Sequence, residues 1–135
     1  MIPVAEALSR ILAAFTPLPA ETVALPDALG RVLAADVTAR LTQPPAAVSA
    51  MDGYAVRAAD VAAVPTVLRR IGEAPAGGAF AGTIGPGEAV RIFTGAALPA
   101  GADAVVIQED TSVDGDRVTV SEPVSAGRFV RPGGL

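Results

Sequence analysis

Apolar residues recur with helical spacing at the start of the chain. These positions are Val4, Leu8, Ile11, Leu12 and Phe15. Their offsets of 4, 7, 8 and 11 from the first of them place all of them on one stripe of a helix. Pro3 suits the first turn of such a helix, and Pro17 forbids its continuation. The pattern therefore predicts a helix with one apolar face between these two prolines.

The pattern between residues 16 and 40 is weaker. Residues 21–25 are typical of a short strand, and Asp27 could cap a single turn that ends at Gly30. The periodicity of residues 31–38 does not distinguish an extended segment from a helical one. Only the first helix is clearly predicted in this part of the chain.

From residue 41 onward, Pro and Gly separate short β-branched runs at intervals of about ten residues. Asp114-Gly115 lies between two alternating runs and is typical of a β-hairpin turn. The predicted strands are residues 53–57, 66–72, 88–93, 104–110, 117–122 and 128–131. Because strands and helices do not alternate, a parallel dinucleotide-binding sheet is disfavoured. The pattern predicts an α+β fold that is mostly β.

Composition narrows the chemistry that these elements can carry. The 135 residues include no His, no Cys and no Trp, and all 10 basic residues are Arg. Thiol nucleophiles, imidazole bases, Schiff-base lysines and the usual structural zinc clusters are therefore excluded from this chain. Any catalysis must use carboxylates, hydroxyls, backbone N–H groups, Arg, or a hard ion such as Mg²⁺.

Charge and hydropathy limit the classes of partner that the chain can bind. The net charge of −4 argues against a nucleic-acid surface, which needs a basic face. No apolar run approaches the roughly 20 residues of a membrane span, and the N-terminus lacks the pattern of a signal peptide. We therefore expect a cytoplasmic protein that binds neither nucleic acid nor membrane. Because the last residues are turn formers, we also expect the chain to be part of a longer one.

Residues 44–57 form the first segment that could carry chemistry. A double proline leads into small residues and then into Ser49, Met51, Asp52, Gly53 and Tyr54. The simpler interpretation is a stiff loop and an Asp-Gly turn that opens a strand. In the functional interpretation, the Asp52 carboxylate and the Ser49 hydroxyl are available to an ion or a polar ligand, which Gly53 allows to approach the backbone.

Residues 91–106 form the second such segment. A strand runs into Thr94, Gly95 and Ala96, and a Pro-Ala-Gly turn follows. Consecutive N–H groups at this turn, together with the Thr94 hydroxyl, could bind an oxyanion. The alternative is an ordinary turn at the end of a strand, and the residue types alone do not exclude it.

In this order, the two segments resemble one known family, the molybdopterin molybdenumtransferases, which insert molybdate into molybdopterin. The strings that carry the resemblance include SAMDGYAVRAAD at residues 49–60 and GPGEAVRIFTGAALPAGADAVVIQED at residues 85–110. Residues 28–37 and 128–135 also match the family pattern, so that nearly the whole chain is covered.

The resemblance implies a domain organisation. Residues 1–40 would form a helical first subdomain, to which residues 126–135 return, and residues 41–125 a second subdomain of bent and coiled sheets. A later α/β domain, which holds the pterin and the nucleotide, is absent from this chain. The resemblance also implies a homodimer in the full-length protein.

The implied reaction depends on Mg²⁺, which is bound mainly by the absent domain. Molybdate and adenylylated molybdopterin are the substrates, and AMP is released. By position, the family's catalytic residues fall on Asp52 and Thr94. Its substrate-binding residues fall on Ser49, Met51, Gly53, Tyr54, Gly95 and Ala96. We expect the two segments to converge on a hollow that receives the tetrahedral metal oxide, and this chain alone to show no turnover.

The chain departs from the family at one important place. Ala46, Ala47 and Val48 stand where typical members have Phe, Asp and Asn, and Gly134-Leu135 replaces a Gly-Glu-Asp sequence. The missing Asp removes a hard ligand and a charge. These departures favour an alternative function, a non-catalytic scaffold or binding module of the same architecture, whereas the intact string from Ser49 to Arg57 favours the enzyme.

Overall fold

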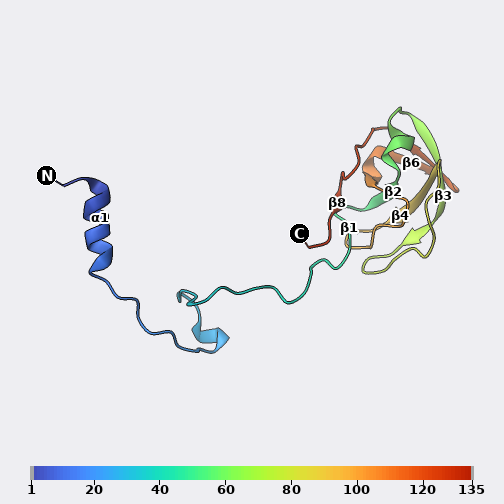
Figure 1. The fold of residues 1–135 in the computed structure, drawn as a ribbon. Helices are drawn as coiled ribbons and strands as arrows, with labels where there is room; N and C mark the ends of the chain where they lie inside the picture. The colour runs from blue at the N-terminus through green and yellow to red at the C-terminus, as the bar shows by residue number, and fades with distance from the viewer. Residues whose placement is uncertain (1, 135) are drawn as a thin grey trace. The chain divides into compact units, whose positions relative to one another are not determined.

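The computed structural model describes residues 2–134 (Figure 1). Their contacts divide the chain into two units, with the boundary between Ala39 and Arg40. The prediction that residues 126–135 return to the first unit stays a prediction. The departure from the family pattern at Leu135 lies outside the described residues.

The first unit contains the predicted helix. Helix α1 spans Val4–Ala13, and Pro3 stands at its N-cap with its carbonyl accepting a bond from the N–H of Ala7. An ion pair between Glu6 and Arg10 links successive turns. Every residue of the predicted apolar stripe is at least half exposed. The helix is thus held by local bonds and not by burial.

The predicted strand at residues 21–25 is wrong. Residues 21–24 have no regular structure, and a single turn of 3₁₀ helix, η1, follows at Leu25–Asp27 and leads to Gly30 in the left-handed region. A strand needs a neighbour for its backbone bonds, and within the described part of the first unit no strand is present to pair with it. Residues 31–38 form neither of the two predicted structures.

The second unit is built on a curled six-stranded sheet with the order β5-β2-β4-β3-β7-β6 (Figure 1). Only β3 and β4 run parallel to each other. A short pair, β1 with β8, lies outside this sheet. The strands are β1 (Val48–Ser49), β2 (Gly53–Val56), β3 (Thr66–Ala74), β4 (Glu88–Ile92), β5 (Ala104–Ile107), β6 (Thr111–Asp114), β7 (Arg117–Val120) and β8 (Val130–Arg131).

Most predicted strands are present with shifted ends, and β1 and β6 were not predicted. The strand predicted at residues 104–110 ends at Ile107, because a 3₁₀ turn, η3, takes up Gln108–Asp110. Another such turn, η2, spans Ala58–Val61. The hairpin between β6 and β7 is confirmed, although its turn is Gly115-Asp116: Asp114 pairs with Arg117, and Gly115 has a positive φ of 59°.

The sheet buries side chains on both of its faces. Along β2, Tyr54 and Val56 belong to one apolar cluster and Ala55 to the other. Along β5, Val106 belongs to the same cluster as Tyr54, and Val105 belongs to the same cluster as Ala55. This double burial explains the nearly continuous apolar runs in these two strands.

The fold class is therefore confirmed: an α+β chain that is mostly sheet, with one N-terminal helix. None of the described residues belongs to a helix with the length and apolarity needed to cross a membrane.

Candidate functional site

The structure brings the two candidate segments into direct contact. The N–H of Gly95 donates to the carbonyl of Ser49 at 2.9 Å, and the N–H of Ser49 donates to the carbonyl of Ala96 at 2.9 Å. The N–H of Leu98 adds a bond to the carbonyl of Ala47. Residues separated by more than 40 positions in sequence are thus joined as a small ladder beside the sheet. We call this contact the junction.

Asp52 and Thr94 form the side-chain part of the junction. Oδ1 of Asp52 accepts bonds from both the backbone N–H and the hydroxyl of Thr94, each at 2.8 Å. The N–H of Thr94 and then its hydroxyl hold the pKa of the Asp52 carboxyl below its ordinary value, and the charge of Arg91 adds to this effect. Asp52 is therefore a half-buried carboxylate that stays ionised at neutral pH.

The N–H groups of residues 94–96, which we predicted to bind an oxyanion, are bonded within the chain. All three N–H groups are already used: that of Thr94 by Asp52, that of Gly95 by Ser49, and that of Ala96 by the carbonyl of Phe93. The Thr94 hydroxyl is used as well. A carboxylate of the chain itself occupies the place that we assigned to an external anion.

The hydroxyl of Ser49 is not available to a ligand either. Ser49 is completely buried, and its Oγ donates to the carbonyl of Met51 at 2.6 Å while the N–H of Met51 approaches the same Oγ at 3.3 Å. These contacts close the turn that presents Asp52. Ser49 thus shapes the loop, and its predicted substrate contact is not formed by an accessible side chain.

Gly53 and Tyr54 belong to the sheet and not to an open surface. A Cβ on Gly53 would lie 1.9 Å from the carbonyl oxygen of Val106, so the close approach of β2 and β5 requires glycine here. Tyr54 is 5 % exposed and lies within the apolar core. Both residues fix the position of Asp52, which directly precedes them.

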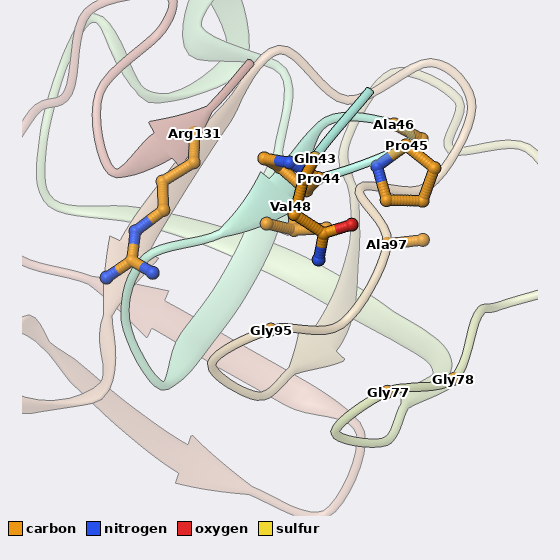
Figure 2. Close-up of a pocket in the computed structure, with 10 residues that line it drawn as sticks. All are labelled: Gln43, Pro44, Pro45, Ala46, Val48, Gly77, Gly78, Gly95, Ala97 and Arg131. Carbon is orange, nitrogen blue, oxygen red and sulfur yellow. The ribbon is translucent and has the colours of Figure 1, made fainter. Parts of the chain in front are cut away.

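A cavity of about 610 Å³ lies beside the junction (Figure 2). Figure 2 shows Arg131 on one side, Pro45, Ala46 and Ala97 on the other, and Gln43 between them. The lining residues are Gln43, Pro44, Pro45, Ala46, Val48, Gly77, Gly78, Gly95, Ala97 and Arg131. The volume lies within the range of small-molecule sites.

Of the predicted site residues, only Gly95 lines this cavity. The two segments bond to each other directly, so the hollow lies next to their junction and not between them. Arg131 was not predicted. Its only signal in the sequence was its basic charge near the end of the chain, and within residues 2–134 no acidic side chain forms an ion pair with it.

The carboxylates of the described residues do not gather into a metal site. No group of three acidic side chains lies close enough in residues 2–134 to hold an ion. Asp52 is the carboxylate at the junction, and no hydrogen bond to its Oδ2 is found among these residues. The chain thus fits Mg²⁺ only as the donor of one carboxylate, with the remaining ligands supplied from elsewhere.

The family comparison agrees with the resemblance in the sequence. A family model described as the MoeA N-terminal region, domains I and II, matches residues 2–135. A molybdopterin molybdenumtransferase of Nostoc sp. is 46 % identical over 115 residues, which cover 82 % of this chain and 26 % of that protein. One from Staphylococcus aureus strain Mu50 is 40 % identical over 131 residues, which cover 92 % of this chain and 30 % of that protein.

The structural comparison points the same way. The crystal structure of a molybdopterin biosynthesis MoeA protein from Pyrococcus horikoshii OT3 is similar, with a TM-score of 0.80 and 36 % sequence identity. The match covers 99 % of this chain and 36 % of that chain. The chain therefore spans about a third or less of the length of the relatives that it matches.

Proposed function

The chain belongs to the family of the MoeA N-terminal region, domains I and II, and from this premise we propose that it forms the first part of a molybdopterin molybdenumtransferase. The full-length enzyme would insert molybdate into adenylylated molybdopterin and release AMP. The observation that carries this proposal is the junction, which bonds the ionised Asp52 to Thr94, the residue that precedes Gly95, which lines a cavity of small-molecule size.

Asp52 would act as the charged group of this half of the site. Its Oδ1 is committed to Thr94, which fixes the direction of the carboxylate, while Oδ2 remains for a cation or a water. Mg²⁺ is commonly held by one or two carboxylates together with substrate phosphates and water. Asp52 suits the role of one such ligand, and Thr94 suits the role of its positioning partner.

The cavity would receive the anionic part of the substrates. Arg131 lines it with a guanidinium, a group whose planar donors match oxyanions. The prolines, alanines and Val48 form an apolar wall opposite this charge. This combination suits a small molecule with a flat apolar body and an anionic group. In the full-length protein, which we propose is a cytoplasmic homodimer, further residues would complete the site.

The test uses the full-length protein with adenylylated molybdopterin, molybdate and Mg²⁺, and measures AMP release. We expect Asp52→Asn to lower the rate about a hundredfold, the scale seen when one preorganised electrostatic contact is removed. Asp114→Asn, which changes an exposed carboxylate of the hairpin, is the matched control and should keep the rate. If the unmodified protein releases no AMP, the scaffold alternative is correct.

A further inference from the structure

We propose that Arg91 is the positioning residue of the junction: it connects the backbone beside Asp52 to the Phe93 ring beside Thr94 and so keeps the two side chains bonded. This inference rests on the proposed function only for the importance of Asp52. Arg91 does not contact the Asp52 carboxylate through any hydrogen bond or ion pair found among the described residues, so it acts through the groups around it.

The hydrogen bonds of Arg91 hold the turn that carries Asp52. Arg91 lies on β4 opposite Tyr54 of β2, and its Nη1 donates to the carbonyl of Gly53 at 3.1 Å. Its Nη2 donates to Oε1 of Gln108 at 2.8 Å, and the N–H of Gln108 in turn donates to the carbonyl of Asp52 at 3.1 Å. Two successive carbonyls, those of Asp52 and Gly53, are therefore fixed directly or indirectly by one guanidinium.

The guanidinium of Arg91 also contacts two aromatic rings, one of which belongs to the residue before Thr94. The Cζ of Arg91 lies 4.6 Å from the ring centre of Phe93 and 5.3 Å from that of Tyr54. Both distances are within the range of cation–π attraction. Phe93 directly precedes Thr94, whereas Gly53 directly follows Asp52. One side chain thus contacts a sequence neighbour of each partner in the Asp52–Thr94 pair.

The geometry requires arginine and not merely a positive charge. The planar guanidinium reaches two acceptors in different elements, Gly53 of β2 and Gln108 of η3, and at the same time contacts two rings. A lysine ammonium is a point charge at the end of a flexible stem. Because Arg91 has no ion-pair partner among residues 2–134, its charge also favours the ionised form of Asp52. We therefore expect the conservative Lys variant to keep the charge effect and to lose the positioning.

Nuclear magnetic resonance of the 135-residue chain tests this role without any substrate. The readouts are the titration of the Asp52 carboxyl carbon and the hydrogen exchange of the Thr94 amide. In Arg91→Gln we expect the pKa of Asp52 to rise and the Thr94 amide to exchange about tenfold faster, as suits a weakened bond to a charged acceptor. In Arg91→Lys we expect the same faster exchange with a pKa that stays near that of the unmodified chain.

Arg69→Gln is the matched control. Arg69 is exposed and pairs with Glu88, so its loss should change neither readout. The inference is overturned if Arg91→Gln leaves both readouts unchanged, or if the amide of Val118 in the core accelerates as much as that of Thr94, because the effect is then general loosening. If Arg91→Gln does not fold, Arg91→Lys decides: unchanged Thr94 exchange refutes the positioning role. None of these readouts depends on molybdate insertion, so they stand even if the proposed enzyme activity fails.

Discussion

The two units of the chain hold their shape in opposite ways. Helix α1 rests on local bonds, and the apolar side chains that line one of its faces are largely exposed. The sheet of the second unit rests on partners distant in sequence and buries apolar side chains on both faces. An amphipathic pattern is therefore enough to specify an element, but only non-local burial stabilises it strongly. The candidate site lies in the second unit, where the buried residues lie.

Matched isoleucine variants give the largest expected difference between the units. Ile92 is completely buried, whereas Ile11 is 56 % exposed. We expect Ile92→Ala to lower the free energy of unfolding by about 2 to 5 kcal/mol, through lost apolar contact and the cavity left behind. Ile11→Ala should change it by less than about 0.5 kcal/mol. Denaturant unfolding followed by the fluorescence of Tyr54, the chain's one Tyr, reports on the second unit alone.

If the two variants are equally destabilising, the apolar face of α1 is buried in solution, and the contrast between the units is wrong. Helical circular dichroism of the same samples reports mainly on α1, the one α-helix of residues 2–134. It should show that helix α1 persists in Ile92→Ala under conditions where the Tyr54 signal is lost.

Gly53→Ala sharpens the comparison within the second unit. The new Cβ would meet the carbonyl oxygen of Val106 at 1.9 Å, and this atom is backbone that cannot rotate away. We expect a loss of about 1 to 3 kcal/mol from overpacking, measured by the same unfolding transition. Gly87→Ala in the same unit is the control, since no atom lies within 4 Å of its added Cβ and only the strain of its positive φ remains. A Gly53→Ala chain as stable as the unmodified one would show that β2 and β5 can separate.

Acid gives the smallest expected effect. The pKa of Asp52 is lower in the folded chain than in the unfolded one, because Thr94 donates two bonds to the charged form. The bonds to Thr94 therefore stabilise the fold fully at a pH above the pKa of Asp52 in the unfolded chain, which is about 4. This stabilisation is lost as the pH falls through the lower pKa of the folded chain. We expect Asp52→Asn to flatten this part of the stability curve of the second unit. An unchanged acid profile in this variant would mean that the bonds to Thr94 do not favour the ionised carboxyl.

Local patterns in the sequence predicted the elements better than their ends and pairings. The helix and most strands follow from periodicity and from Pro and Gly positions. The strand at residues 21–25 failed because apolar spacing alone supplies no partner strand, and β1 was missed because Val48–Ser49 is too short to show a period. These errors concern contacts between distant residues, which a local pattern does not contain.

The site shows the same division. The resemblance led us to expect that the segments around Asp52 and Thr94 converge. It did not show that every N–H group of residues 94–96 donates to an acceptor of the same chain. A turn with small residues looks the same in sequence whether its N–H groups face solvent or a carboxylate of the same chain. The contacts of Arg91 were equally hidden, because they depend on the register of β4 against β2.

The pairing of β1 with β8 has a consequence for the modularity of the second unit. Val48 lies opposite Arg131, and the N–H of Gly134 donates to the carbonyl of Pro44 at 3.0 Å. The first and the last strands of this unit therefore lie side by side. Such a unit can be grafted into a loop of a foreign host, or circularly permuted through a short linker, without stretching its sheet.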